Sequence, residues 1–281
     1  MSTLNKTKEL LNRYGLYAKK GFGQNFLVDD SVLEKIVDAG NLSSSDTVIE
    51  IGPGLGNLTE YLLNRAGKVI AFEIDKDMVN ILQNRFSNME NFDLINKDIM
   101  EVDLNEYMPS SVKIIANLPY YITTPILFKL LEYRDKISSI VIMVQREVSQ
   151  RLLAKPNSKD YGVLTVNTSY ISDMSLVTIV PNTSFVPAPN VTSAVVKMNI
   201  NLDKLKDIKD EELFKKLVKA SFSARRKKVI NSIMNSNLFN ISKEQLAEHI
   251  KSIGFSECVR AEEIPVNKYI ELANILKESN C

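Results

Sequence analysis

The sequence predicts a doubly wound α/β domain followed by a small helical domain. Over residues 47–145, short apolar strand patterns alternate with helical patterns. Such alternation is typical of a parallel sheet covered by helices on both faces. Near residue 201 the composition changes to the charged stretch NLDKLKDIKDEE, and only helical patterns follow. We therefore expect one domain over residues 1–203 and a second over residues 204–281.

The elements of the first domain follow from their apolar periodicity. Residues 1 to about 30 are a basic and then polar lead-in, and a helix is expected after it because Ser31 and Glu34 have capping-box spacing. Helices are also predicted over 57–65 and 76–86. The predicted strands are TVIEIG (47–52), KVIAFEID (68–75), FDLINKD (92–98), VKIIANL (112–118), SSIVIMVQ (138–145) and a closing pair, MSLVTIV (174–180) and TSAVVKMNI (192–200).

The second domain is expected to contain helices over residues 211–234, 242–253 and 265–279, each with helical spacing of apolar residues. The first of these carries a dense run of lysine and arginine.

Composition excludes several classes of protein. The chain has 281 residues, of which 44% are apolar and 25% are charged. Its 35 basic and 34 acidic side chains nearly cancel, so the net charge alone does not indicate a nucleic-acid partner. Two cysteines and one histidine make a zinc site, a disulfide framework or Ser-His and Cys-His catalysis unexpected. The start of the chain lacks a signal-peptide core, and no apolar run approaches the length of a membrane helix. We expect a cytoplasmic protein that needs no metal and no membrane, and nothing calls for an oligomer, so a monomer is expected.

A glycine-rich turn, VIEIGPGLGNLTE, joins the first strand to a helix. Glycine at 52, 54 and 56 permits a tight turn and close approach of the backbone to a ligand. The dinucleotide fingerprint would need a further glycine where Asn57 stands, and the Gly-Lys-Ser/Thr of a Walker loop is absent. The loop therefore suits a ligand without a pyrophosphate, although such a turn is also common in α/β proteins that bind nothing there.

Polar residues follow the next strands at the same edge. Glu73 ends the second strand and can accept from ribose hydroxyls, and Asp98 ends the third strand and can accept from an adenine amine. Either residue alone would be interpreted as a solvent-exposed carboxylate at the end of a strand. Together with Gly52, Gly54 and Asn117 they predict a site for S-adenosylmethionine at the carboxyl edge of the sheet.

The stretch NLPYYITTP follows the fourth strand. An adenine N6 amine is a poor nucleophile, and it needs acceptors that hold its hydrogens and turn its lone pair toward the methyl group. The Asn117 side-chain oxygen and the Leu118 carbonyl are the expected acceptors; Pro119 stiffens the turn, and Tyr120 offers a ring on which a displaced base stacks. The alternative is a turn whose tyrosines only cover a core edge.

Seven stretches in order resemble the KsgA/RsmA family of small-subunit ribosomal RNA adenine dimethyltransferases. They are GQNFLVD, EIGPGLGNLTE, NLPYYITTPILF, MVQREVSQRL, KDYGVLTV, FVPAPNVTSAVV and FSARRKKVIN. The resemblance covers nearly the whole chain. It implies a Rossmann-like methyltransferase that uses S-adenosylmethionine to dimethylate two adjacent adenosines near the 3′ end of 16S rRNA, within the small subunit or its precursor, and that acts in subunit biogenesis.

The resemblance also assigns residues. It implies that Asn25 and Leu27 close over the cofactor, that Gly52 contacts its methionine part, and that Asn117 contacts both cofactor and target base. The resemblance implies that Phe185 is a second stacking face for the base. The alternative is that Phe185 is a core residue. Pro187 and Pro189 follow it closely and favour a rigid loop, which supports the stacking role. Two positions depart from the family pattern, Thr192 in place of an acidic residue and Ser169 in place of glutamine, and they affect only fine RNA contacts.

A basic surface is expected to bind RNA phosphates. Its members are Lys19, Lys20, Arg146, Arg151, Arg225, Arg226, Lys227 and Lys228, with Lys215, Lys216 and Lys219 on the same predicted helix. The alternative is a solvated charged helix face. A phosphate-binding surface predicts strongly salt-dependent RNA binding.

Three other functions agree less well with the sequence. A 23S rRNA dimethyltransferase of the macrolide-resistance type typically has lysine where Leu55 stands and lacks FSARRKKVIN. A DNA adenine methyltransferase usually has a second proline where Leu118 stands. A non-catalytic ribosome-assembly factor would be expected to lose Glu73, Asn117 or Tyr120, and all three are present.

Overall fold

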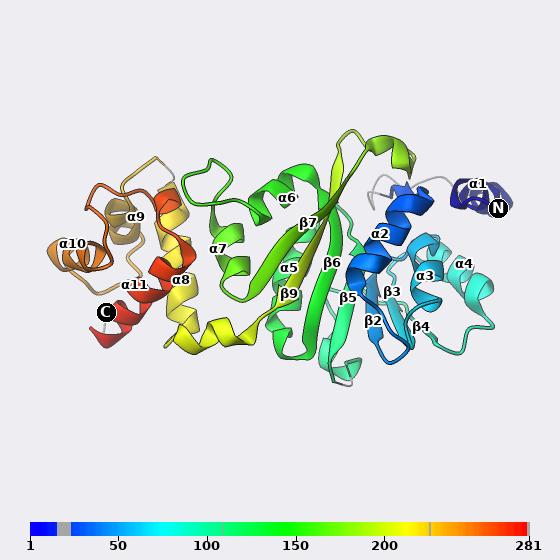
Figure 1. Cartoon of the computed structure of the whole chain (residues 1–281), viewed down its shortest axis with the longest axis horizontal. Coiled ribbons are helices and arrows are strands. Elements are labelled where there is room, and N and C mark those ends of the chain that lie inside the picture. The colour runs from blue at the N-terminus through cyan, green and yellow to red at the C-terminus, as the bar shows by residue number, and fades with distance from the viewer. Residues whose placement is uncertain (16–23, 109, 225, 280–281) are drawn as a thin grey trace. The chain divides into compact units, whose positions relative to one another are not determined.

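The computed structural model describes residues 1–15, 24–108, 110–224 and 226–279. It divides into two compact units (Figure 1). The first unit consists of Met1–Ser149 and Met174–Ile200, and the second of Gln150–Asp173 and the chain from Asn201 onward. The grouping of Gln150–Asp173 with the C-terminal helices differs from a single division between residues 203 and 204. That division remains a prediction about domains.

A seven-stranded sheet forms the centre of the first unit. Its strands lie in the order β4-β3-β2-β5-β6-β9-β7. Strands β2 to β6 pair in parallel, whereas β9 runs antiparallel to β6. The bounds are β2 Thr47–Ile51, β3 Lys68–Phe72, β4 Phe92–Ile95, β5 Val112–Asn117, β6 Ile137–Gln145, β7 Ser172–Val180 and β9 Ser193–Ile200. The predicted α/β class is confirmed. From β2 the chain adds β3 and β4 toward one edge of the sheet, and it then adds β5 and β6 on the other side of β2. The strand order therefore reverses between β2 and β5, and open α/β sheets bind ligands at such a point.

Helices connect the strands and cover the sheet. They are α2 Asp30–Gly40, α3 Asn57–Leu63, α4 Lys76–Phe86, α5 Thr123–Glu132 and α6 Arg146–Leu152, with short 3-10 turns η2 Leu104–Glu106, η3 Arg134–Lys136 and η4 Asn182–Ser184. In Figure 1, α2 lies across the near face of the sheet, and Leu33, Ile36 and Val37 of this helix join the core of buried strand residues.

Two features of the N-terminal segment differ from expectation. Residues Thr3–Arg13 form helix α1, where the sequence predicts only a lead-in. Its fully buried positions, Thr3 and Thr7, are polar, and its apolar contacts come from the partly buried Leu10 and Leu11. Helix α2 is capped by Asp29, whose carboxylate accepts from the backbone of Ser31 and Val32, so the predicted Ser31 cap is wrong. Strand β1 (Phe26–Leu27) pairs antiparallel with β8 (Phe185–Val186).

The second unit is helical. It contains α7 Val163–Ser169, α8 Glu211–Ser221, α9 Val229–Asn235, α10 Lys243–Ser252, α11 Val266–Glu278, and the 3-10 turns η5 Leu202–Asp207, η6 Phe222–Ala224 and η7 Ala261–Glu263. Tyr161 and Tyr269 pack around Phe222 in its core. The Tyr161 hydroxyl donates to the Ile264 carbonyl at 2.9 Å, which explains why Gln150–Asp173 belongs to this unit.

The single helix predicted over residues 211–234 is wrong. Helix α8 ends at Ser221, and α9 begins only at Val229. Between them the chain turns at Arg226 and Lys227, and Lys228 forms an isolated bridge with Arg260. The basic run interrupts the apolar stripe, so a continuous helix would have no buried face there. Within the described residues, the structure has no helix with the length and apolar character to cross a membrane.

Candidate active site

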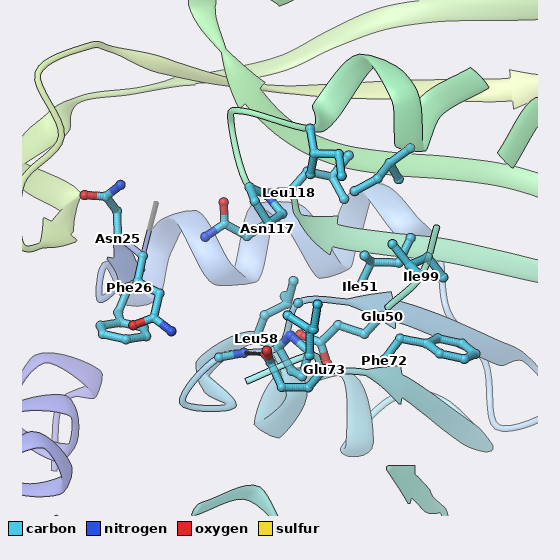
Figure 2. A pocket seen from close by; sticks show the side chains of 18 of the residues that line it. Asn25, Phe26, Glu50, Ile51, Leu58, Phe72, Glu73, Ile99, Asn117 and Leu118 are labelled. Atoms are coloured by element: carbon cyan, nitrogen blue, oxygen red, sulfur yellow. Dashed lines mark hydrogen bonds between the residues drawn. The ribbon is translucent and has the colours of Figure 1, made fainter. Parts of the chain in front are cut away.

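A pocket opens at the carboxyl ends of β2, β3 and β5 (Figure 2). This is the edge of the sheet, next to the reversal between β2 and β5, where the sequence placed a ligand. Its lining includes Gln24, Asn25, Phe26, Leu27, Glu50, Gly52, Gly54, Asn57, Glu73, Ile74, Lys97, Asp98, Ile99, Asn117, Leu118, Pro119, Tyr120 and Tyr121. The expected cofactor-binding residues and the expected adenine-binding turn therefore meet in one cavity.

The glycine turn after β2 forms one wall of the pocket. Gly54 has a φ of +58°, and a Cβ on it would lie 3.3 Å from the Phe26 ring. Gly56 has a φ of +81°, and a Cβ there would lie 2.6 Å from Phe86. Both positions need glycine, Gly54 to bring backbone to the pocket beside Phe26 and Gly56 to pack the turn against α4.

Glu73 fixes the shape of this turn. Its Oε2 accepts from the backbone N–H of Gly54 at 3.0 Å, and its Oε1 accepts from that of Asp75 at 2.9 Å. Asn96 donates to the Glu73 carbonyl at 2.8 Å. The side chain is buried, and this burial raises the pKa of its carboxyl despite the opposing effect of the backbone donors, those of Asp75 and Gly54 first. The carboxylate at the end of β3 thus joins two elements of the pocket wall while still facing the cavity.

Asn57 occupies the place where the dinucleotide fingerprint has glycine. Its amide donates to the Thr7 hydroxyl at 2.9 Å and to the Leu27 carbonyl at 2.8 Å, and the residue is buried. It therefore ties both α1 and β1 to the start of α3. The sequence showed that glycine was missing at this position, but it did not indicate what the amide holds.

Glu50 is a buried carboxyl group under the glycine turn and is not among the site residues that the sequence predicts. It is 1% exposed, and Thr59 donates to its Oε2 at 2.7 Å. Burial raises its pKa from 4.5 to about 8, and the nearby charge of Glu73 adds to the rise. An acidic residue inside the apolar strand TVIEIG was the signal that could have drawn attention to it.

The turn after β5 presents the Asn117 amide. The backbone N–H of Leu118 donates to Met143 at 3.3 Å, and the Pro119 carbonyl accepts from the Thr123 hydroxyl at 3.0 Å. Figure 2 shows the Asn117 side chain projecting toward the side of the pocket where Asn25 and Phe26 lie. Among the described residues, none hydrogen-bonds to this amide. The turn is braced by its neighbours, which leaves the amide group for a ligand.

Tyr120 lines the pocket and is held from behind. Its hydroxyl and the Ser193 hydroxyl lie 2.6 Å apart, and Ser193 is fully buried at the start of β9. Burial raises the pKa of Tyr120, so its hydroxyl stays protonated at neutral pH. The sequence predicted the tyrosine ring but not Ser193, which lies 73 residues away.

Two predicted site residues lie elsewhere than expected. Strand β4 ends at Ile95, so Asp98 lines the pocket from the loop beyond the strand, where its Oδ1 accepts from the Met100 N–H at 2.8 Å. Phe185 is 3% exposed, pairs with Leu27 across β1 and β8, and packs in the main core. The structure does not bring Phe185 to the pocket lining, and its role as a stacking face remains a prediction.

The expected RNA-binding residues are distributed over both units. Arg146 is exposed at the start of α6, and Arg151 is exposed near the end of the same helix. Arg226, Lys227 and Lys228 are exposed in the second unit, in the turn between α8 and α9. Lys19, Lys20 and Arg225 lie outside the described residues.

The lysines of α8 differ in their surroundings. Lys215 pairs with Glu211 at 2.8 Å and with Glu212 at 3.5 Å, which offsets its charge. Lys216 and Lys219 are exposed on the same helix.

The described residues contain no group of three or more His, Cys, Asp or Glu side chains arranged to hold a metal ion. The expectation of a reaction without a metal remains a prediction.

The fold is that of Rossmann-like methyltransferases. A solved dimethyladenosine transferase from Plasmodium falciparum superposes with a TM-score of 0.80 at 26% identity, over 91% of this chain and 98% of that one. The solved 23S rRNA methyltransferase ErmE superposes with a TM-score of 0.71 at 23% identity, over 90% of this chain and all of that one, and so shows the shared fold alone.

Residues 15–278 match the model of the ribosomal RNA adenine dimethylase family, and the chain belongs to this family. Two relatives carry the name ribosomal RNA small subunit methyltransferase A. The one from Lachnoclostridium phytofermentans is 42% identical over 97% of this chain and 96% of its own length. The one from Bacillus mycoides is 41% identical over 98% and 97%. The resemblance inferred from the seven sequence stretches is confirmed.

Proposed function

We propose that this protein uses S-adenosylmethionine to dimethylate the N6 amines of two adjacent adenosines near the 3′ end of 16S rRNA, as a step in small-subunit biogenesis. Membership of the ribosomal RNA adenine dimethylase family supports the chemistry, and the names of the 41–42% identical relatives support the small subunit as target. The observation that carries the proposal is the Asn117 amide, which faces the pocket with no partner among the described residues.

The pocket has the groups that S-adenosylmethionine needs. The backbone of the glycine turn at Gly52 and Gly54 lines the cavity for the methionine part, and the buried Glu73 offers carboxylate oxygens for ribose hydroxyls. Asp98 is placed to accept from the adenine amine, with the apolar side chain of Ile99 beside it. Asn25 and the Leu27 backbone complete the cavity from the N-terminal segment.

When bound, S-adenosylmethionine supplies an electrophilic methyl group on a sulfonium. The protein's part is to position the amine. The Asn117 oxygen and the Leu118 carbonyl accept the N6 hydrogens, two before the first transfer and one before the second, which directs the nitrogen lone pair out of the ring plane. After each transfer the methylated nitrogen releases its extra proton to water. Tyr120, held by Ser193, supports the face of the displaced base. Positioning and electrostatic stabilisation account for the rate enhancement, and no side chain in the turn acts as a strong base.

The RNA itself is bound by exposed basic residues. Arg226, Lys227 and Lys228 form a compact basic turn in the helical unit, and Arg146 adds an exposed charge in the first unit. Their contacts to phosphates would make binding strongly salt-dependent. We further propose that the protein acts in the cytoplasm as a monomer and uses no metal.

The test is to incubate the protein with labelled S-adenosylmethionine and small ribosomal subunits that lack dimethyladenosine, with large subunits in parallel. We expect label as dimethyladenosine near the 3′ end of the small-subunit RNA. Label confined to the large subunit would overturn the target and favour a 23S enzyme. Tight subunit binding without label would favour a non-catalytic assembly factor.

The variant Asn117→Ala tests the role of the turn. We expect kcat to fall about 10²–10³-fold, the usual effect of removing one preorganised polar contact to the reacting group. The matched control is Asn84→Ala, which removes an exposed amide of α4 that does not line the pocket. Equal activity of the two variants would refute the role of Asn117.

A further inference from the structure

Tyr121 is the exposed neighbour of the half-buried Tyr120 in the same turn. Tyr120 bonds to the buried Ser193 behind the pocket, whereas Tyr121 lines the pocket with 63% of its surface exposed. Within the described residues, the Tyr121 ring stacks on no other ring and its hydroxyl forms no hydrogen bond. A large aromatic side chain is therefore presented to solvent at the mouth of the cavity.

The backbone around Tyr121 is held firmly. The Pro119 carbonyl accepts from the Ile122 N–H at 3.3 Å and from the Thr123 hydroxyl at 3.0 Å, and α5 begins directly after the turn. Because the backbone is held on both sides, the Cα of Tyr121 has a defined position at the rim of the pocket. Interaction surfaces for single-stranded RNA commonly combine such an exposed ring with nearby positive charge.

The covalent structure of RNA brings a second base to this rim. A base that enters the pocket remains tied by its phosphodiester linkages to its neighbours in the strand. Once it leaves the stack, a neighbouring base loses a stacking partner and lies at the mouth of the cavity. An exposed tyrosine ring there offers a replacement face, and every base has a π-face that can use it.

We propose that Tyr121 forms a second nucleobase subsite, which stacks the base adjacent to the target adenine in the RNA strand. This inference rests on the proposed function, because it requires an RNA base in the main pocket. The two tyrosines then have different roles: the half-buried Tyr120 ring supports the reacting base, and the exposed Tyr121 ring holds its neighbour. The subsite needs an aromatic face and does not need the hydroxyl.

Three variants separate these requirements. Tyr121→Phe keeps the ring, Tyr121→Leu keeps apolar bulk without a ring face, and Tyr121→Ala removes both. With small subunits that lack dimethyladenosine, we expect kcat/KM for the subunit to stay within about twofold in Tyr121→Phe. It should fall about 5- to 150-fold in the other two, the range for loss of one stacked base. The Kd for S-adenosylhomocysteine should not change in any of them.

Two results would overturn the subsite. Activity of Tyr121→Leu and Tyr121→Ala within twofold of the unaltered protein would show that the ring does not contribute. A rise in the Kd for S-adenosylhomocysteine that accounts for the whole loss would make Tyr121 a wall of the cofactor site instead. If the unaltered protein does not methylate small subunits, the proposed function fails, and the subsite is then judged by binding.

The binding measurement uses short oligouridylates with one adenosine and a 2-aminopurine next to it, on the 5′ side in one RNA and on the 3′ side in another. The fluorescence of 2-aminopurine reports stacking of the neighbouring base. We expect the unaltered protein and Tyr121→Phe to change this fluorescence in one of the two RNAs, and Tyr121→Leu to leave it unchanged at saturating protein. Identical responses of the unaltered protein and Tyr121→Leu in both RNAs would refute the subsite.

Discussion

Replacing Ser193 with alanine tests whether a buried hydroxyl holds the tyrosine of the Asn-Leu-Pro-Tyr turn. The Ser193 and Tyr120 hydroxyls are 2.6 Å apart, and Ser193 is fully buried. Ser193→Ala leaves the tyrosine hydroxyl without this partner, and Tyr120→Phe leaves the serine hydroxyl without its own. The two substitutions therefore remove one contact from opposite sides.

The expected size follows from the burial of the pair. Leaving a buried polar group without its partner costs about 1–3 kcal/mol, whereas removing both partners is nearly neutral. Because Tyr120 also borders the pocket, water compensates its hydroxyl in part, and we expect about 1–2 kcal/mol for each single variant. The double variant should lose no more than either single variant, so the coupling energy should be about 1 kcal/mol or more.

The assay is a double-mutant cycle read in two ways. The free energy of unfolding measures the contact, and kcat for methyl transfer to small subunits measures the effect of ring position. We expect kcat to fall up to about tenfold in each single variant, with the Kd for S-adenosylhomocysteine unchanged. Ser193→Thr, which keeps a hydroxyl, should restore kcat. Additivity of the two single variants within about 0.5 kcal/mol would refute the coupling.

Three further predictions concern the glycine turn and its support. Burial raises the pKa of Glu50 from 4.5 to about 8. Between these two pH values the folded protein holds a proton on Glu50 that the unfolded chain has released. The free energy of unfolding should therefore fall as the pH rises from 4.5 to 8, by at most about 5 kcal/mol. Glu50→Gln should remove that fall, and a difference between the two proteins that is constant from pH 5 to 8 would contradict it. Asn57→Ala removes two buried hydrogen bonds to the N-terminal segment. Titration calorimetry should then show that the Kd for S-adenosylhomocysteine rises about tenfold. An unchanged Kd would mean that other contacts hold the segment. Gly56→Ala places a Cβ 2.6 Å from Phe86 at a φ of +81° and should lower the free energy of unfolding by about 2–4 kcal/mol. The control is Gly15→Ala, at a φ of +61° with open space around it, which should lower the free energy of unfolding by only about 1 kcal/mol. Equal losses in the two variants would show that the clash with Phe86 is relieved without cost.

Much of the catalytic unit could be predicted because its signals are local. Alternating strands and helices, the glycine turn and the polar strand ends depend on periodicity and on neighbours in sequence. The parallel arrangement then places all carboxyl ends at one edge, which is why Glu73 and Asn117 meet in one pocket. Helix α1 escaped prediction because its most buried positions are the polar Thr3 and Thr7, while Leu10 and Leu11 are only partly buried.

The sequence by itself determined the class of fold, the strand edge that holds the pocket, and most of the named residues that line this pocket. These properties follow from short-range pattern and from the family resemblance. Only the tertiary structure decided that Tyr120 bonds to Ser193, 73 residues away, and that Asn57 bonds to Thr7, 50 residues away. It also decided that Phe185 packs in the core and that Tyr121 is exposed. Such facts depend on which distant surfaces pack together, because burial and hydrogen-bond partners are set by the whole fold and not by the neighbours of a residue in the chain.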